Sequence, residues 1–397
     1  MSTRSADSLT LALAAMGDPE DRTANSGWPT GVLSALREIV AQVVPIRDSP
    51  YSGTARLAFT AGAILGVRPS DLRHPREAKG RLWNVGKASL PYALARARTV
   101  RGELANAGSL DGFVQNGGDY PAPRGVRMVT YQDSTVAQAL DAYPWPHLLG
   151  LTRRDIRGMV RRQRDAYESA IGCCTFTQWN ADSIASDFGI PRSKIHVVGL
   201  GTNGSFPESD TQERDWATPR FLFVGFDWVR KNGDLVLEAF ARIRESVPAA
   251  TLDLVGRHPT VDLAGVTGHG VLAMDDPEQR ARLTSLYQQA TAFVMPSLHE
   301  PAGTVYVEAA AAGIPAIGTR NGGSATCIGP AGYVVDPASP VELFDAMHRL
   351  CDPATAASCG ALGREHAKQF TWRKVAERLV RALSIPNVDL TGFAEFL

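Results

Sequence analysis

Short apolar runs alternate with longer amphipathic runs along the whole chain, and this alternation constrains the fold more than any other feature. A short run rich in apolar and β-branched residues fits a buried strand, and the amphipathic run after it fits a helix that packs on a sheet. Repetition of this pair is typical of parallel α/β sheets. The sequence therefore predicts an α/β protein built from doubly wound, Rossmann-like sheets.

About six strands are expected in each half of the chain, enough for a complete parallel sheet. In the first half the expected strands are Leu9–Ala15, Ile39–Val44, Gly112–Gln115, Val126–Tyr131, Ile171–Phe176 and Lys194–Val198. In the second half they are Arg220–Gly225, Ala250–Val255, Gly270–Ala273, Thr291–Pro296, Pro315–Thr319 and Gly332–Val335. Helices are expected between them, for example at Leu235–Val247 and Gln279–Ala290.

A polar stretch separates the two halves. Residues Gly201–Pro219 are rich in Gly, Ser, Thr, Asp and Pro and have no apolar periodicity, as is typical of a linker. We therefore expect an N-terminal domain at residues 1–205 and a C-terminal domain at residues 206–372. Two such domains joined by a linker are expected to leave a cleft between them. Doubly wound sheets bind ligands at the carboxyl ends of their strands, so a ligand is expected there.

Composition excludes several classes of protein. The 397 residues are 44% hydrophobic and 21% charged, and 41 basic residues balance 41 acidic ones, so no overall charge favours nucleic acid or a membrane. Five cysteines without a C-x-x-C pair argue against a disulfide framework and against a zinc site. Leu9–Ala15 reads as a buried strand rather than a secretion signal, and no apolar run is long enough to span a membrane. A cytoplasmic protein is expected.

Two segments depart from this neutral background, the basic stretch Arg73–Arg81 and a longer basic helix. The expected helix Thr152–Ala170 carries six arginines, which Asp155, Asp165 and Glu168 only partly offset. A solvated helix face is the favoured interpretation. Attraction to an anionic acceptor or to a membrane surface stays open as the alternative.

The stretch "HEPAGTVYVEAAAAGIPAIGT", His299–Thr319, has the features of a ligand site. Glu300 follows an expected strand, and Gly303 and Thr304 open a helix whose first amides lack intrahelical acceptors and can hold a phosphate. Glu308 lies about one turn further along and would accept hydrogen bonds from a diol such as a ribose. The alternative is a plain helix whose early carboxylates complement the dipole.

A second loop supplies positive charge. The segment "FLFVGFDWVRKNGDLVLEAF", Phe221–Phe240, predicts a strand, a tight loop with Arg230 and Lys231, and a helix. Two adjacent cations suit a diphosphate, because arginine offers a planar fork of donors and lysine a compact charge. A surface basic pair is the alternative. Because both loops follow strands of one parallel sheet, cations and free amides are expected at the same edge.

The motifs "GFDWVRKNGDLVLEAF" and "PSLHEPAGTVYVEAAAAGIPAIGTRNGG" resemble the donor-binding half of the retaining glycosyltransferases of the GT-B fold, family 4, also called glycosyl transferases group 1. Glu300 and Glu308 match the E-x7-E motif of that family. The resemblance covers nearly all of Arg220–Gly323, motif by motif and in order, and it extends to the two-domain layout.

The resemblance implies roles for individual residues. Arg230 and Lys231 would grip the donor diphosphate, and Glu300 would bind hydroxyls of the donor sugar. Glu308 would accept hydrogen bonds from the ribose. Gly303 and Thr304 would lie next to the phosphates.

Two further segments resemble parts of the same family. "SGWPTGV", Ser26–Val32, is similar to the glycine loop of the acceptor domain, where Gly27 and Gly31 would approach the donor phosphate and the acceptor. "TWRKVAERLVRAL", Thr371–Leu383, resembles the terminal helix, so residues 373–397 are expected to cross back to the N-terminal domain.

Some positions depart from the pattern of the family. Phe226 stands where an arginine is usual, and Thr326 replaces the acid of the family motif GGxxE. Gln132 and Asp133 stand where many members carry a histidine on the acceptor side. Asp133 is our candidate for orienting the acceptor hydroxyl, with a turn-capping aspartate as the equally open alternative.

The resemblance implies a retaining, front-face transfer of a sugar from a nucleotide-diphosphate sugar to a hydroxyl acceptor. No D-x-D pair stands on a suitable loop, so no metal and no other cofactor is expected. The acceptor is expected to meet loops at Val67–Gly86 and Tyr143–Arg164. Nucleic acid is not an expected partner, and peripheral membrane contact is open but not favoured. A GT-B-like nucleotide-sugar isomerase and a non-catalytic nucleotide-sugar-binding protein are the alternatives.

Overall fold

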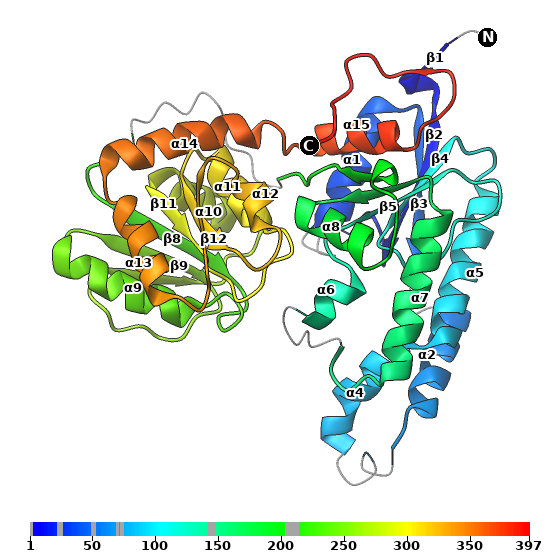
Figure 1. Ribbon diagram of the computed structural model, residues 1–397, viewed down its shortest axis with the longest axis horizontal. Coiled ribbons are helices and arrows are strands. Elements are labelled where there is room, and N and C mark those ends of the chain that lie inside the picture. Colours follow the sequence, from blue (N-terminus) through cyan, green and yellow to red (C-terminus); the bar gives the residue numbers. More distant parts are fainter. Residues whose placement is uncertain are drawn as a thin grey trace. The chain divides into compact units, whose positions relative to one another are not determined.

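The structure is a computed structural model that describes residues 3–21, 27–48, 53–68, 71, 75–141, 148–202 and 214–397. The chain forms two compact units. Unit 1 comprises Met1–Leu200 and Trp372–Leu397, and unit 2 comprises Gly201–Thr371. Each unit has its own six-stranded sheet with helices packed on it (Figure 1). Most of the predicted linker lies outside the described residues.

The sheet of unit 1 has the strand order β3-β2-β4-β5-β6-β7, and its pairings are parallel. Its strands are β2 Thr10–Met16, β3 Gln42–Asp48, β4 Gly112–Asn116, β5 Met128–Gln132, β6 Gly172–Thr175 and β7 Ile195–Val197. Two short strands, β1 Arg4–Ser5 and β14 Val388–Asp389, pair separately and join the two termini of the chain within unit 1.

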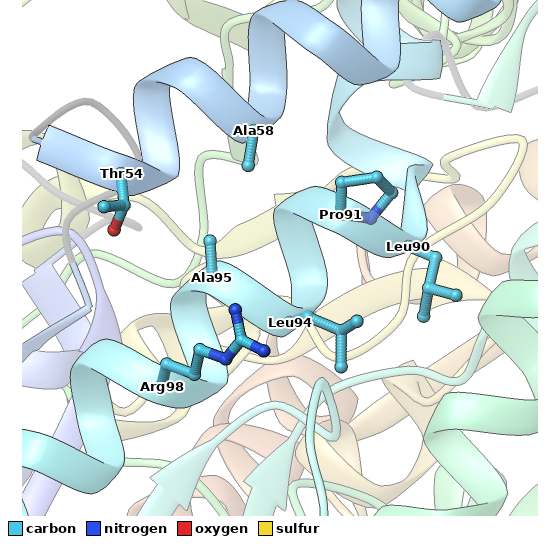
Figure 2. A pocket seen from close by; sticks show the side chains of 7 residues that line it. All are labelled: Thr54, Ala58, Leu90, Pro91, Leu94, Ala95 and Arg98. Atoms are coloured by element: carbon cyan, nitrogen blue, oxygen red, sulfur yellow. The ribbon is translucent and has the colours of Figure 1, made fainter.

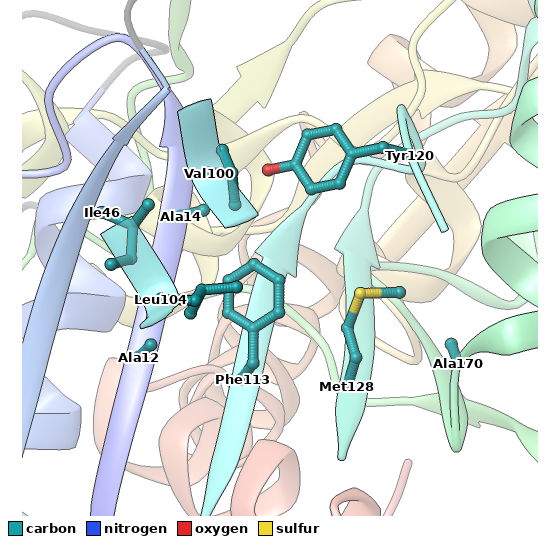
Figure 3. Packing of buried hydrophobic residues seen from close by; sticks show 9 residues of the cluster. All are labelled: Ala12, Ala14, Ile46, Val100, Leu104, Phe113, Tyr120, Met128 and Ala170. Carbon is teal, nitrogen blue, oxygen red and sulfur yellow. The ribbon is translucent and has the colours of Figure 1, made fainter. Parts of the chain in front are cut away.

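Helices of unit 1 cover this sheet and extend beyond it. They are α1 Trp28–Ile39, α2 Gly53–Leu65, α4 Pro75–Ala88, α5 Leu90–Asn106, α6 Val136–Asp141, α7 Arg153–Ser169, α8 Gln178–Ser186 and α15 Trp372–Ala382. Val100 and Leu104 of α5 pack on Phe113 of β4 and Met128 of β5 in one buried cluster (Figure 3). Removal of these apolar side chains from water holds α5 against the sheet.

Unit 2 repeats the architecture with the order β10-β9-β8-β11-β12-β13, again parallel. The strands are β8 Arg220–Gly225, β9 Thr251–Gly256, β10 Val266–Gly270, β11 Ala292–Val294, β12 Ala316–Thr319 and β13 Gly332–Val335. The helices are α9 Gly233–Ser246, α10 Pro277–Gln289, α11 Thr304–Ala311, α12 Ser324–Ile328, α13 Pro340–Arg349 and α14 Pro353–Ala367. Helix α9 packs with α13, and α11 packs with α14 on the other face of the sheet (Figure 1).

Each sheet reverses its strand order once. In unit 2 the chain runs outward from β8 to β10 and then returns to place β11 on the opposite side of β8. In unit 1 the same reversal falls between β2 and β4. Doubly wound sheets bind ligands at such a switch point, outside the carboxyl ends of the strands. The expected fold class of two doubly wound α/β domains is confirmed.

Two strand predictions need correction. The first predicted Ile39–Val44, whereas Ile39 is the last residue of α1 and β3 begins at Gln42, because the apolar run combines the buried end of a helix with the start of a strand. The second predicted Gly270–Ala273, whereas β10 is Val266–Gly270. As a partly exposed edge strand, β10 lacks the apolar run by which buried strands are detected.

The predicted acceptor loops also differ from the structure. In Val67–Gly86 the described residues from Pro75 onward form α4, whose buried Ala78, Val85 and Ala88 share one helical face. Of Tyr143–Arg164, residues 143–147 lie outside the described residues, and from Arg153 the segment is helix α7. The predicted basic helix is confirmed, and Thr152 begins it through a capping box with Asp155.

Candidate active site

The loop after β8 holds the two predicted cations at the carboxyl edge of the unit 2 sheet. The backbone N–H of Lys231 donates to the carbonyl of Asp227 at 2.8 Å, which closes a tight turn before α9. Gly225 ends β8, and a Cβ built there would lie 3.0 Å from Cγ of Lys231. The absence of a side chain at Gly225 therefore lets the lysine stem lie against the end of the strand.

Glu300 is fixed through its backbone to the loop that follows β12. Its N–H donates to the carbonyl of Asn321 at 3.0 Å, and its carbonyl accepts from the N–H of Gly323 at 2.9 Å. Gly322 lies between these two partners with φ of 126°, and a Cβ there would stand 2.0 Å from the carbonyl oxygen of Glu300. Only glycine fits this position, so the "NGG" stretch sets the place of the carboxylate.

The carboxylate of Glu300 meets both cations. Its Oε2 lies 3.3 Å from Nη1 of Arg230 and forms an ion pair with Nζ of Lys231. Nη1 of Arg230 also donates to the carbonyl of His299 at 2.9 Å, and Oγ of Ser297 lies 3.4 Å from Oε2 of Glu300. Arg230 and Lys231 follow β8 while Glu300 follows β11, so the cluster lies at the switch point of the sheet.

The electrostatics favour the ionised form of this cluster. Burial alone would raise the pKa of Glu300, but the charges of Lys231 and Arg230 outweigh burial and lower it. Burial lowers the pKa of Lys231, against the attraction of Glu300. Asp227 also lies near, with its Oδ2 3.6 Å from Nε of Arg230, but its side chain is half exposed, so water screens its charge more than that of the buried Glu300. Inside the partly dehydrated site the two cations therefore outnumber the one buried carboxylate and leave an excess of positive charge. Such an excess suits an anion with more than one negative charge.

Helix α11 begins beside Glu300. Its N-cap is Gly303, with φ of 85°, and a Cβ there would stand 2.5 Å from the ring of Tyr306. That ring is buried, and its hydroxyl donates to the carbonyl of Met295 at 2.7 Å. The backbone N–H groups of Gly303 and Thr304 have no carbonyl of α11 one turn before them to bond to. This end of the helix therefore offers hydrogen-bond donors and the positive end of the helix dipole.

Glu308 lies on α11 and faces a partner that the sequence motifs do not reveal. The hydroxyl of Tyr287, on α10, donates to Oε2 of Glu308 at 3.2 Å. Burial raises the pKa of Glu308, and the bond from Tyr287 partly offsets that effect. Tyr287 is itself fully buried, so it fixes the carboxylate of Glu308 in one orientation.

His299 precedes Glu300 and is fully buried. Burial lowers its pKa to about 4, although the negative charge of Glu300 acts in the opposite direction. The imidazole is therefore neutral near pH 7. None of the sequence motifs indicates a role for His299.

The remaining predicted residues lie in unit 1. Asp133 follows β5 and is exposed, and the hydroxyl of Ser134 donates to its Oδ1 at 2.9 Å. Gly27 is the N-cap of α1, with φ of 76°. At Gly31 a Cβ would stand 2.4 Å from the indole of Trp372, so the structure gives this glycine a packing role. Ser26 lies outside the described residues.

Sequence reasoning missed the residues that support the site. Tyr287, Ser297 and His299 lie in runs that read as helix or strand ends, and no spacing rule singles them out. Gly322 could have been found, because a Gly–Gly pair directly after a buried strand indicates a close approach of two backbones. Among the described residues, no group of three or more His, Cys, Asp or Glu side chains could hold a metal ion. None of the described helices is long and apolar enough to cross a membrane.

Comparison with known proteins agrees with this geometry. Residues 218–352, which contain the whole cluster, match the family model "Glycosyl transferases group 1". A D-inositol 3-phosphate glycosyltransferase of Corynebacterium diphtheriae is 37% identical over 210 residues, which cover 47% of this chain and 49% of the relative. A GDP-mannose-dependent alpha-(1-6)-phosphatidylinositol monomannoside mannosyltransferase of Mycolicibacterium smegmatis is 31% identical over 233 residues, covering 52% and 60%. The chain thus spans about half the length of these relatives.

Solved structures extend the likeness to the whole chain, at the level of the fold. The glycosyltransferase WaaG has a TM-score of 0.57 at 15% identity, covering 95% of this chain and 99% of that protein. A sucrose-phosphate synthase of Thermosynechococcus elongatus has a TM-score of 0.59 at 17% identity, covering 94% and 98%. The chain therefore has the GT-B type of fold, and its segment 218–352 is similar to the glycosyl transferases of group 1.

Proposed function

We propose that the protein is a glycosyltransferase that moves a sugar from a nucleotide-diphosphate sugar to a hydroxyl acceptor. The observation that carries the proposal is the meeting of Arg230 and Lys231 with Glu300 at the switch point of unit 2, beside the start of α11. This arrangement combines donors for a diphosphate with an acceptor for sugar hydroxyls. The likeness of residues 218–352 to group 1 glycosyltransferases supports the same assignment.

Departure of the diphosphate is the step that these residues would assist. As the anomeric C–O bond breaks, negative charge grows on the leaving phosphate oxygen. Arg230, Lys231 and the amides of Gly303 and Thr304 would stabilise that charge, and fixed donors of this kind are among the largest contributions to catalysis. Their charge would replace that of a metal, so we propose that the reaction needs no metal and no other cofactor.

The two glutamates would have separate tasks. Glu300, held by two cations, would accept hydrogen bonds from hydroxyls of the donor sugar and orient the anomeric carbon. Glu308, oriented by Tyr287, would accept hydrogen bonds from the two ribose hydroxyls of the nucleotide. A carboxylate with two oxygens suits a vicinal diol.

Transfer would retain the configuration of the anomeric carbon. The acceptor oxygen would bond to that carbon on the face that the diphosphate leaves, and its proton would pass to the departing phosphate oxygen. Asp133, in unit 1, is our candidate for orienting the acceptor hydroxyl. Gly27, the N-cap of α1, and Gly31, within that helix, would lie close to the donor phosphate and the acceptor, as the family resemblance implies. We propose a polyol or glycan hydroxyl as the acceptor, since two relatives are named for transfer to inositol phosphate and to a phosphatidylinositol mannoside.

The test compares Glu300→Ala and Glu308→Ala for nucleoside diphosphate affinity and for turnover. UDP-, GDP-, ADP- and TDP-sugars serve as donors, and D-inositol 3-phosphate is the first acceptor. We expect Glu300→Ala to lower turnover about 10²-fold with little change in affinity. We expect Glu308→Ala to weaken affinity about ten-fold with turnover at saturating donor nearly unchanged. Glu238→Ala, on the exposed side of α9, is the matched control.

Equal effects of the two substitutions would contradict this division of tasks. Epimerisation of the donor sugar without any acceptor would instead support a nucleotide-sugar isomerase. Tight diphosphate binding with no turnover for any acceptor would support a non-catalytic binding protein.

A further inference from the structure

Positive charge is concentrated in one part of this electrically neutral chain. The stretches 53–68 and 78–102, which include helix α2, most of α4 and the first thirteen residues of α5, contain eight Lys and Arg residues and no Asp or Glu. The acidic residues of α4 and α5, Glu77 and Glu103, stand directly outside these stretches. Two of the eight are neutralised inside the fold: Arg96 pairs with Asp48, and Arg81 pairs with Asp71. The side chains of Arg56, Arg68, Lys79, Arg98 and Arg101 are exposed.

The outward face of α2 is apolar. Leu57, Ile64 and Leu65 are 72%, 64% and 80% exposed, although a surface helix of a globular domain normally presents polar side chains there. Ala61 lies between them at helical spacing, and Arg56 is the only charged residue of α2. The inward face carries Phe59 together with small residues such as Ala55 and Gly62. Leu57, Ile64 and Leu65 thus face out of the fold, whereas Phe59 of the same helix packs inward on Trp83 and Tyr92.

A groove between α2 and α5 enlarges this apolar face. It has a volume of about 380 Å³ and is lined by Ala58 of α2 and by Leu90 and Leu94 of α5, with Arg98 at one end (Figure 2). Leu90 and Leu94 are themselves exposed. Along α2 the groove residues Thr54 and Ala58 are continued by Ala61 and Leu65 at helical spacing, so groove and apolar face are continuous.

The basic helix α7 adds charge next to this region. Arg68 donates to the carbonyl of Gly150 at 3.1 Å, which brings the end of α2 to the segment just before α7. Arg162 and Arg164 bond to carbonyl groups of Ala88 and Phe188. The other arginines of the helix, Arg153, Arg154, Arg157 and Arg161, are exposed.

We propose that the α2–α5 face, which comprises the outward side of α2 and its groove with α5, binds an anionic lipid membrane surface. This face is apolar, has no acidic residues and is bordered by exposed Lys and Arg side chains. It is therefore complementary to a lipid layer that is negative at its headgroups and apolar beneath them. A thirteen-residue helix is too short to span a bilayer, so α2 would lie along the surface. This inference does not depend on the transfer reaction, and either can fail without the other.

The test measures binding of the full chain to vesicles of phosphatidylcholine, with and without phosphatidylglycerol, by flotation at low and high salt. We expect binding only to the vesicles with phosphatidylglycerol, and weaker binding at high salt. Leu57→Ser combined with Leu65→Ser should abolish most of it. Arg98→Glu combined with Arg101→Glu should weaken it by at least about twenty-five-fold, since each basic residue near an anionic surface contributes about five-fold.

Matched controls carry the same changes elsewhere on the protein. Val341→Ser removes an apolar side chain that is 60% exposed on α13 of unit 2, and Arg124→Glu reverses an exposed charge outside the helices. Both should bind like the wild type. Because the substituted side chains are exposed, thermal unfolding should be unchanged in all variants. Equal binding of both double variants and the controls would overturn the proposal. So would a concentration-dependent dimer that is lost in Leu57→Ser with Leu65→Ser, because it would assign the face to self-association.

Discussion

Glu300 stays ionised in a buried site. Burial raises the pKa of its carboxyl group, but the charges of Lys231 and Arg230 lower the pKa by more. The same carboxylate keeps Lys231 and Arg230 in place before a ligand arrives, so the donors are already ordered. Ordering in advance removes part of the entropic cost of binding. A diphosphate would then meet fixed donors rather than flexible surface side chains.

His299 predicts a measurable dependence of stability on pH. Its pKa is about 4 in the folded chain, against 6.5 for an unperturbed histidine. Above pH 6.5 it is neutral in both states and contributes nothing. As pH falls from 6.5 to 4, the unfolded chain binds a proton that the folded chain does not, so the free energy of unfolding decreases, by about 2 kcal/mol at about pH 5.

Urea unfolding of the wild type and of His299→Gln, at about pH 7 and about pH 5, checks this sign and size. The variant should lose less stability on acidification than the wild type. His348→Gln, at an exposed position of α13, is the matched control and should follow the wild type. The same acid slope in all three proteins would contradict the burial of a neutral His299.

At the scale of elements, α1 and α15 form a joint that depends on Gly31. The indole of Trp372 occupies the space that a side chain at Gly31 would need, which ties the last helix of the chain to the first. We expect Gly31→Ala to destabilise unit 1 by about 1–2 kcal/mol, because overpacking outweighs the gain in helix propensity. Gly102→Ala, in α5, meets open space and should stabilise by up to about 1 kcal/mol.

Chemical unfolding measures both changes. The free energy of unfolding should decrease in Gly31→Ala and increase in Gly102→Ala. A Gly31→Ala protein as stable as the wild type would show that Trp372 can move aside. Loss of nucleotide binding in that protein without loss of stability would instead favour the role that the family resemblance implies for Gly31.

The elements that could be predicted from sequence are those whose burial leaves an uninterrupted apolar run. β8, β12 and β13 were predicted within one residue of their observed bounds for this reason. The edge strand β10 is partly exposed and was misplaced. Helices α2 and α5 were not predicted. In α2 apolar side chains stand on both faces, with Leu57 and Leu65 outward and Phe59 inward, so the sequence lacks the usual amphipathic pattern.

The residues of the candidate site could be predicted only where a single loop combines charged side chains with a position directly after a strand. Arg230, Lys231 and Glu300 are conspicuous by charge and by position after strands, and they meet in the structure. Tyr287 is far from Glu308 in the sequence, and only the folded chain shows that its hydroxyl donates to the carboxylate and orients it. Long-range pairs of this kind depend on tertiary packing, which sequence spacing does not encode.

At the scale of the whole molecule, two sheets of the same design carry different chemistry at their carboxyl edges. Unit 2 concentrates cations and helix amides around Glu300, whereas the corresponding edge of unit 1 holds the buried pair of Arg96 and Asp48. A doubly wound sheet fixes where a ligand binds, and the loops decide which ligand. The central claim is therefore about unit 2 and its selectivity for a diphosphate.

The most direct measurement is calorimetric titration of the wild type and of Lys231→Ala with nucleoside diphosphates and the matching monophosphates, in the presence of EDTA. We predict that the wild type binds one diphosphate at least about ten-fold more tightly than its monophosphate, and that Lys231→Ala loses this preference while keeping its affinity for the monophosphate. Equal affinities for the two nucleotides in the wild type, or a diphosphate preference that survives in Lys231→Ala, would contradict the account.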